Sequence, residues 1–443
     1  MRLHLLSILL LTACADHSLP EVSGLTPVAD IDPARDVVHV ALTAAPTTVQ
    51  WVDGGATSVW AYNGQVPGPL IQARVGDTVR VDFTNNLDEP TTIHWHGLRI
   101  PDDMDGVPVI QDPVQPGESF TYEFTVPDAG TFWYHPHVRS NEQIERGLQG
   151  MLVVHEDEPP GYDTERAFVL DDAALRDGGG FYGFGLGGMD AVQGRHGNVL
   201  LANGQTELLE APVVPGTVER WRVVNTANAR TMWVDVKDAD WRVVAIDGTL
   251  LEEPLDGQRL LLPVGRRFDL EVAIRGDVAP SLAVELPAGG PNWDTYPVFT
   301  GTLDEAGSGA VFLPWEVEGL ADQLPIEQEV EVVLGVQGGP VWMINGAAYG
   351  DGDDIPVRAN TPTRITVRDT TGFEHPFHLH GQFFEILERQ SGTPWPGRLD
   401  TVLVHPEETV ELYSTFDNPG TWMAHCHILE HAELGMMTTF SVE

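Results

Sequence analysis

The sequence predicts an all-β protein made of three consecutive Greek-key β-sandwich domains. Gly (46 residues) and Pro (33 residues) are abundant, and long segments with a helical hydrophobic period are scarce, which is typical of short strands joined by turns. A chain of 443 residues with 42% hydrophobic content is too long for one core and suits two or three domains. An internal repeat favours three.

The repeat consists of two pairs of matching segments. Residues 113–137 and 404–427 share a turn, an alternating strand, a Pro/Gly turn, an aromatic strand and a final His-x-His. Residues 71–97 match residues 356–381 in the same way. The two copies end at residues 137 and 427, and this separation leaves room for two units of about 145 residues each.

A middle unit shows the same strand pattern without the histidines. It is visible in residues 211–236 and 262–274. The Gly-rich stretch at residues 178–188 is expected to be a surface loop of the second domain, and the alternative is a disordered tether between domains. We expect domains at residues 34–158, 162–312 and 327–443, with a linker at 313–326 before the last domain.

The N-terminus has the pattern of an export signal. Arg2 precedes an apolar core from Leu3 to Leu11, and small residues follow. Leu11-Thr12-Ala13-Cys14 resembles a bacterial lipobox, in which Cys14 would carry a lipid; the alternative is a plain signal peptide. We therefore expect residues 1–14 to be a lipoprotein-type signal segment. The protein is then expected in the periplasm or cell envelope, held by the lipid at the outer membrane or cell surface.

The composition is strongly acidic, with a formal net charge of −42 and Lys237 as the only lysine among 24 basic residues. This charge would repel nucleic acid and anionic membrane surfaces, so neither is expected as a direct partner, apart from the membrane contact of a lipid on Cys14. The acidic residues are spread along the chain, which favours a role in solubility. Attraction of cationic donors is the alternative. We expect a monomer.

Four histidine pairs are the strongest chemical signal in the sequence. Side chains at positions i and i+2 of a strand share one face, so each pair can hold a metal ion. Domain 1 has Pro136 where domain 3 has Cys426, and only domain 3 therefore has a thiolate to offer. Four histidines come from each of these two domains, so we expect their metal site to lie between the domains. The pairs are His94/His96, His135/His137, His378/His380 and His425/His427.

Cys426 lies between two of these histidines and points to the opposite face of its strand. His375 and His431 are free to join it, and Met436 follows. One thiolate, two imidazoles and a weak thioether are the ligands of a blue-copper electron-transfer centre. An electron accepted at Cys426 would then have a short covalent path to a second site.

These segments resemble the copper motifs of multicopper oxidases, in particular three-domain bacterial laccase-like and cuprous-oxidase-like enzymes. The resemblance runs over nearly the whole mature chain and implies that each sandwich is a cupredoxin domain. It also implies four copper ions: one type 1, one type 2 and a type 3 pair. The implied type 1 ligands are His375, Cys426 and His431, with Met436 axial. The implied type 2 ligands are His94 and His378, and the type 3 ligands are His96, His135, His137, His380, His425 and His427.

The resemblance further implies an oxidoreductase that takes single electrons through His431 and Cys426 and reduces dioxygen to water. Dioxygen reduction consumes protons, so nearby acids matter. Asp105 matches an acid near the type 2 copper of bacterial relatives; the alternative is a turn residue before Gly106. Many relatives have Glu directly after the type 1 His, where this chain has Ala432. Glu433, one position later, is the candidate proton carrier.

Three functions are consistent with these motifs. The first is a laccase-like oxidase of phenols and aromatic amines, which would dock at an exposed edge of His431. The second is a metallo-oxidase of Cu(I) or Fe(II), but residues 346–374 lack the methionines of many cuprous oxidases, and the whole chain has 9. An acidic loop, residues 351–354, could attract metal cations or be a solvated turn. The third is a non-enzymatic cell-envelope protein, which is disfavoured because no copper ligand is missing.

Overall fold

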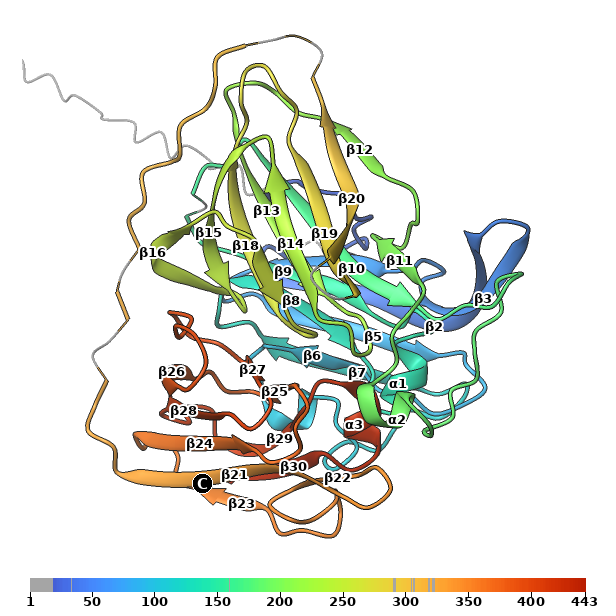
Figure 1. Cartoon of the computed structure of the whole chain (residues 1–443), viewed down its shortest axis with the longest axis vertical. Coiled ribbons are helices and arrows are strands. Elements are labelled where there is room, and N and C mark those ends of the chain that lie inside the picture. Colours follow the sequence, from blue (N-terminus) through green and yellow to red (C-terminus); the bar gives the residue numbers. More distant parts are fainter. Residues whose placement is uncertain are drawn as a thin grey trace, which may run out of the picture.

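Strands form six sheets, which pair into three β-sandwiches in chain order (Figure 1). This arrangement confirms the predicted all-β fold with three consecutive sandwich domains. The computed structural model describes residues 19–443 except 33, 159, 290–291, 304, 306, 318 and 321–322, so the predicted signal segment lies outside the described residues. Within the described residues, every helix is too short to cross a membrane. The helical turns are η1 (Asp102–Met104), α1 (Ser140–Gln143), α2 (Asp190–Gln193) and α3 (Leu429–Glu433).

The first sandwich has two four-stranded sheets. In β5 the apolar side chains of Val79, Val81 and Phe83 are buried, whereas the polar residues between them are half-buried. In β8 every residue is buried, because alternate side chains face the core of this sandwich and the second domain. One sheet has the order β3 (Gly55–Tyr62), β2 (Val37–Val52), β5 (Thr78–Asn85), β7 (Ser119–Thr125), and the other β4 (Gly68–Arg74), β9 (Gly150–His155), β8 (Gly130–His135), β6 (His94–His96).

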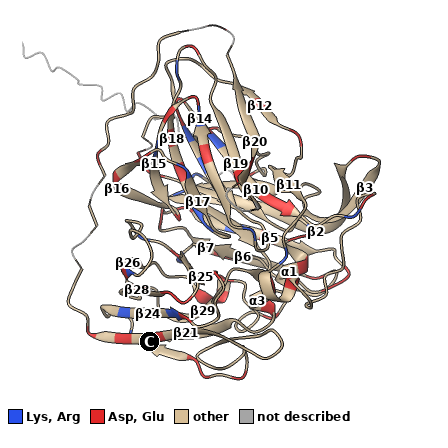
Figure 2. Cartoon of the chain, in the orientation of Figure 1, with Lys and Arg blue, Asp and Glu red and all other residues tan. Residues whose placement is uncertain are grey.

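The second sandwich also includes the first described strand, β1 (Val22–Ser23), which pairs in parallel with β10 although domain 1 lies between them in sequence. Six arginines are buried among the described residues, and all six belong to this part of the chain. Figure 2 shows basic residues on its strands, while acidic residues are spread over the chain. One sheet has the order β1, β10 (Thr164–Ala173), β13 (Val218–Asn225), β18 (Arg267–Ala273), β15 (Asp240–Ile246), β16 (Thr249–Asp256), with β11 (Val199–Ala202) on β10. The other is β12 (Leu209–Pro212), β20 (Asn292–Thr302), β19 (Ser281–Gly289), β14 (Met232–Lys237), β17 (Leu260–Leu262).

The third sandwich repeats the architecture of the first with two five-stranded sheets. Its core includes Trp422, Phe440 and the side chain of Cys426, all buried. The outer sheet is β22 (Val341–Ile344), β21 (Gln328–Gln337), β24 (Thr363–Asp369), β28 (Thr409–Ser414), β26 (Glu385–Arg389). The inner sheet is β23 (Ile355–Val357), β30 (Met437–Val442), β29 (Gly420–Cys426), β25 (His375–Leu379), β27 (Thr401–Val404).

A long connection leads from β20 to β21 along the outside of the molecule (Figure 1). Its described residues contain no strand, and the predicted linker at 313–326 lies within it. Leu313 N–H donates to Glu271 (2.7 Å) in domain 2, and Leu324 N–H donates to the Tyr413 hydroxyl (3.2 Å) in domain 3. On the opposite side, α1 and α2 both contact α3, so one short helix from each domain meets there.

Candidate metal centre

Strand pairing brings the histidine motifs face to face. In domain 1, His94 of β6 lies opposite His135 of β8. In domain 3, His378 of β25 lies opposite His425 of β29, and the next pair is Phe377 with Cys426. The alternation of side chains then sends His425 to one side of β29 and Cys426 to the other. The same register therefore serves two adjacent sites.

The eight paired histidines form one cluster at the boundary between domains 1 and 3. His94 of domain 1 stacks on His380 of domain 3 with ring centroids 3.9 Å apart, and His96 stacks on His378 at 3.7 Å. Groups of three imidazoles have nitrogens within 4.8 Å of one another, a spacing that can hold a metal ion. These groups are His94/His135/His137, His94/His378/His380, His96/His135/His427 and His137/His380/His425.

Hydrogen bonds orient most of these rings by the nitrogen that faces away from the cluster. The Nδ1 atoms of His94, His135 and His378 donate to the carbonyl oxygens of Asp105 (3.0 Å), Pro136 (3.1 Å) and Asp400 (2.9 Å). The Nε2 atom of each of the three rings is buried and has no hydrogen-bond partner. A proton fixed on Nδ1 leaves the lone pair of Nε2 available, which is the form that binds a metal ion.

His96 has the opposite orientation. Its Nε2 atom lies 3.2 Å from Oδ1 of Asp400, and its Nδ1 atom is the one without a partner. Burial alone would raise the pKa of Asp400, but the Arg267 guanidinium and His378 together outweigh it and hold the pKa of that carboxyl below its usual range. Asp400 is therefore an anion that accepts the Nε2 proton of His96, and the chain offers Nδ1 of His96 to the cluster.

Asp105 is fully buried behind two of the rings. Its Oδ2 atom accepts a hydrogen bond from Nδ1 of His380 at 2.8 Å, and Oδ1 lies 3.2 Å from Nδ1 of His94. These rings come from different domains, so one carboxylate orients a histidine on each side of the boundary. This location, next to the outer nitrogens, suits control of ring orientation as well as proton exchange.

The protonation states fit a metal cluster. Burial lowers the pKa of five of the imidazoles well below the usual value, and lowers the pKa of His425 to about 3. The rings are then neutral at physiological pH, as metal ligands must be. Buried nitrogens without hydrogen-bond partners are costly, and several converge here, so copper ions fit this donor set. The five strongly shifted residues are His96, His135, His137, His380 and His427.

The second site groups His375, Cys426 and His431, all fully buried. The sulfur of Cys426 lies 3.4 Å from Nδ1 of His375 and 3.7 Å from Nδ1 of His431, and these two nitrogens are 3.3 Å apart. Burial raises the pKa of the Cys426 thiol, so its thiolate needs a cation beside it. Met436 is buried and joined to the site through its backbone. Its carbonyl oxygen accepts the N–H of Cys426 (3.1 Å), and its N–H donates to the carbonyl oxygen of His431 (2.9 Å).

The predicted exposed edge of His431 is wrong. Its side chain is 0% exposed, because α2 of domain 2 covers it. Nε2 of His431 lies 3.1 Å from the carbonyl oxygen of Val192, and the ring stacks on Trp342 at 3.8 Å. Trp342 in turn donates its indole N–H to the carbonyl oxygen of Ala191 (2.8 Å). Trp342 and His431 therefore contact the carbonyl groups of two consecutive residues of α2, Ala191 and Val192.

The Gly-rich stretch at residues 178–188 leads into this helix and is described throughout. It is a surface loop, as expected, but aromatic side chains fix it to the rest of the protein. Phe184 lies under the guanidinium groups of Arg146 (4.7 Å) and Arg195 (4.6 Å), and Phe181 packs edge-on against Trp51 of domain 1. The cover over His431 thus has contacts with all three domains.

A narrow cavity of about 80 Å³ reaches the histidine cluster from the side of α1 and α3. Its lining includes His135, His137 and His425 of the cluster, together with Ala432 and Glu433. The carboxylate of Glu433 accepts hydrogen bonds from the backbone N–H (2.6 Å) and the hydroxyl (2.8 Å) of Ser140 in domain 1. The cavity is wide enough for water-sized molecules, and Glu433 is its acidic side chain.

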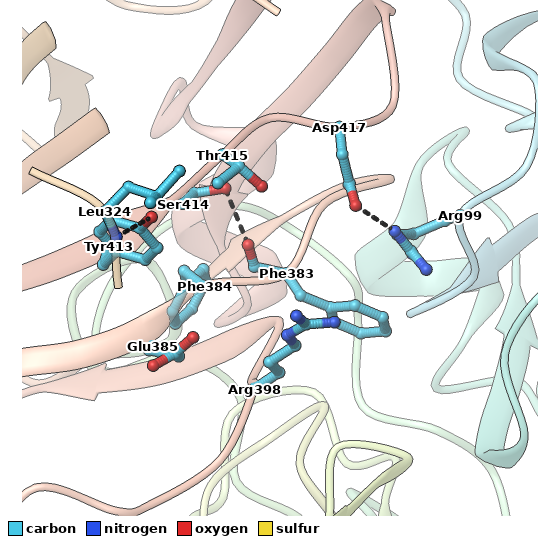
Figure 3. Close-up of a pocket in the computed structure, with 10 residues that line it drawn as sticks. All are labelled: Arg99, Leu324, Phe383, Phe384, Glu385, Arg398, Tyr413, Ser414, Thr415 and Asp417. Carbon is cyan, nitrogen blue, oxygen red and sulfur yellow. Dashed lines mark hydrogen bonds and ion pairs between the residues drawn. The ribbon is translucent and has the colours of Figure 1, made fainter. Parts of the chain in front are cut away.

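Another cavity, of about 130 Å³, has no part in the metal centre. It lies between domains 1 and 3, and its lining includes Arg99, Asp417 and Phe383 but no histidine or cysteine (Figure 3). Arg99 donates to Asp417 (2.6 Å) and to Asp128 (2.7 and 2.8 Å), which joins the two domains. This cavity is therefore a feature of the domain interface.

Sequence reasoning did not identify three components of the site. Asp400 contacts His96 of the cluster, Arg267 holds Asp400, and Trp342 stacks on His431. None of them belongs to a histidine motif, and each reaches the site only through packing of distant segments. The one local signal was the position of Asp400 in a polar segment before a buried strand, which is not specific.

Cupredoxin-like sandwiches with a thiolate site beside a histidine cluster define a copper-binding oxidoreductase. The sequence matches family models described as multicopper oxidase at residues 43–159, 184–278 and 323–443. It is 32% identical to multicopper oxidase MmcO of Mycobacterium tuberculosis, over 97% of this chain and 93% of that protein.

Two solved structures are similar over nearly the full length. One is a multicopper oxidase of Campylobacter jejuni described as a metallo-oxidase, with a TM-score of 0.83 and 26% identity, covering 96% of each chain. The other is the laccase-like CueO of Ochrobactrum sp., with a TM-score of 0.82 and 26% identity, covering 95% of this chain and 100% of that one. The chain belongs to the multicopper oxidase family, oxidoreductases that use dioxygen as electron acceptor.

Proposed function

We propose that this protein is a laccase-like multicopper oxidase, which couples one-electron oxidation of phenols or aromatic amines to the four-electron reduction of dioxygen to water. The observation that carries the proposal is the placement of Cys426 between two cluster histidines. In β29, His425 pairs with His378 and the next residue, Cys426, pairs with Phe377, so the side chains of His425 and Cys426 point to opposite sides of the strand. Copper ions, when bound, would supply one-electron transfer at the cysteine site and dioxygen reduction at the histidine cluster.

The proposed ligand sets follow the donor groups. His375, Cys426 and His431 would hold the type 1 copper, with the buried Met436 as a fourth ligand. His94 and His378 would hold the type 2 copper. The two type 3 ions would be held by His96, His135, His137, His380, His425 and His427, which gives four copper ions in all.

Two acids are proposed to handle protons. Glu433 lines the narrow cavity beside His135 and His137 and can exchange protons with water there. Asp105 contacts His94 and His380 from behind. Exchange of Glu433 for Gln should slow dioxygen uptake without altering copper content, because this carboxylate binds Ser140 and not a ligand nitrogen. A loss of copper in that variant would contradict the assignment.

Electron donors are proposed to dock on α2, since this helix covers His431. The peptide group of Val192 touches Nε2 of the ring, so it offers a short path for an electron from the surface. The metallo-oxidase alternative has one specific observation in its favour. Met189, at the start of α2, is 61% exposed beside Asp190, and a thioether next to a carboxylate suits a soft metal cation.

The deciding experiment is dioxygen uptake by the copper-loaded protein with a dimethoxyphenol, Cu(I) and Fe(II), compared by kcat/KM. A higher value for the phenol, with no peroxide accumulating, supports the laccase-like proposal. A higher value for either metal ion supports the metallo-oxidase alternative. Full copper occupancy with no uptake from any donor would leave only the non-enzymatic function.

We also propose that the protein is exported to the periplasm or cell envelope and anchored by a lipid on Cys14, and that it is a monomer. The lipobox-like sequence at residues 11–14 supports the anchor. Metabolic labelling with a fatty acid, compared between the natural chain and Cys14→Ser, tests it. Label in both proteins or in neither would contradict the proposal.

A further inference from the structure

We infer that Arg267 is a positioning residue for the metal centre, although it belongs to domain 2, which supplies no histidine to the cluster. It holds Asp400, and Asp400 turns His96 so that Nδ1 faces the cluster instead of Nε2. This inference rests on the proposed copper cluster and assigns domain 2 a direct part in it.

Arg267 joins the three domains at one guanidinium group. The side chain is 0% exposed and lies at the start of β18. Its Nε–H donates to the carbonyl oxygen of Thr131 in domain 1 (2.9 Å). Its two terminal nitrogens donate to the two carboxylate oxygens of Asp400 in domain 3 (2.8 and 2.7 Å). A bidentate pair of this kind fixes both position and rotation of the carboxylate.

Asp400 transmits this position to histidines on both sides of the domain boundary. Its carboxylate oxygen Oδ1 lies 3.2 Å from Nε2 of His96 in domain 1. Its backbone carbonyl oxygen accepts a hydrogen bond from Nδ1 of His378 in domain 3 at 2.9 Å. Since a carboxylate can only accept, Nε2 of His96 must carry the proton and Nδ1 must keep its lone pair.

Two glycines show how closely domain 2 approaches the cluster. A Cβ atom on Gly97, which follows His96, would lie 2.3 Å from a terminal nitrogen of Arg267 and 2.7 Å from Oδ2 of Asp400. A Cβ atom on Gly265 of domain 2 would lie 3.0 Å from Cε1 of His96 and 3.1 Å from Cδ2 of His427. The backbone of domain 2 therefore packs directly against histidines of both other domains, and the glycine of the HWHG motif makes room for the Arg267–Asp400 pair.

The test compares Arg267→Met with Arg222→Met. Arg222 is an equally buried arginine of domain 2 that also reaches Thr131 (Oγ1, 2.9 Å), but its carboxylate partners are Glu165 and Asp269 instead of Asp400. It therefore controls for the loss of a buried charge at the same boundary. The measurements are copper bound per chain, the blue absorption of the cysteine site, and the electron paramagnetic resonance signal of the remaining copper.

We expect Arg267→Met to bind cluster copper about 10–100-fold more weakly, the usual effect of removing a support behind a metal ligand. The blue absorption per chain should persist, because neither Cys426 nor its two histidines contact Arg267. Arg222→Met should retain both. Full cluster copper in Arg267→Met, or equal copper loss in the two variants, would overturn the inference.

A conservative variant covers the case in which Arg267→Met does not fold. Arg267→Lys keeps the charge but loses the two-pronged contact. We expect it to fold and to bind cluster copper less tightly than the natural chain, and unchanged copper binding would refute the positioning role. If the natural chain itself binds copper only at the blue site, the proposed function fails, whatever the variants do.

Discussion

Substitution of Gly194 should uncover the edge of His431. Gly194 follows α2 with φ 75° and ψ 167°, a backbone region that is essentially restricted to glycine. A Cβ atom there would lie 2.3 Å from Cβ of Ala229 and 2.6 Å from Cγ2 of Ile428, directly before α3. Gly194→Ala therefore strains the backbone and pushes α2 away from the site that it covers.

The expected strain exceeds the contribution of the two hydrogen bonds that join α2 to Trp342 and His431. The unfavourable backbone conformation costs about 1–3 kcal/mol, and overpacking adds about 1–3 kcal/mol. The hydrogen bonds from Trp342 and His431 to α2 contribute about 0.5–1.5 kcal/mol each. Displacement of α2 thus relieves more strain than it loses in hydrogen bonding. With α2 displaced, a donor can meet the His431 ring directly instead of through the Val192 peptide group. Since 1.4 kcal/mol corresponds to a tenfold change in an equilibrium, we expect kcat/KM for a phenol to rise about tenfold or more.

The assay is dioxygen uptake with a dimethoxyphenol and with Fe(II), a donor small enough to gain less from the opening. Gly188→Ala is the matched control, because Gly188 also has a positive φ (66°) and precedes α2, yet nothing lies within 4 Å of its added Cβ. An unchanged kcat/KM for the phenol in Gly194→Ala, with the blue absorption intact, would refute the view that α2 limits access. An equal rise in both variants would refute the role of the clash with Ala229 and Ile428.

Three further results are expected. Cys426→Ser should fold, lose the blue absorption and oxidise no donor; activity comparable to the natural chain would contradict electron entry at Cys426. Asp105→Asn should weaken cluster copper binding or lower kcat about 10–100-fold, because the Asp105 carboxylate contacts histidine rings from two domains (His380 at 2.8 Å and His94 at 3.2 Å). Normal copper binding together with a normal kcat would exclude an orienting role. The metal-free protein should lose stability as the pH falls from about 6.5 toward 5, because the unfolded chain binds protons that the buried histidines, such as His425 and His431 with pKa values of about 3, do not. Each such histidine contributes a slope of about 1.4 kcal/mol per pH unit well below pH 6.5, partly offset by Glu145 and Glu430, whose pKa values are raised to about 7. A thermal midpoint that does not fall over this range would contradict neutral, buried ligands.

The sequence was sufficient for the features that depend on local spacing. The all-β fold follows from turn residues and strand alternation, and the four histidine pairs carry their own signature because residues two positions apart share a strand face. The register that sets Cys426 apart from His425 is a consequence of the same rule.

Contacts between distant segments could not be predicted from spacing. The choice of nitrogen in His96 depends on Asp400, more than three hundred residues later in the chain, and on Arg267 in another domain. The exposed edge predicted for His431 was wrong because exposure depends on where a loop of domain 2 lands. Phe184, held between Arg146 and Arg195, sets that position, and the composition of a Gly-rich stretch gives no indication of it.

The order of the elements along the chain constrains the timing of assembly. During synthesis the N-terminal part emerges first, yet β1 has no partner until β10 is made, more than one hundred residues later. The cluster draws ligands from His94 to His427, so it stays open until nearly all of the 443 residues have been synthesised. A nascent chain therefore presents half-built copper sites, and complete metal loading has to follow synthesis.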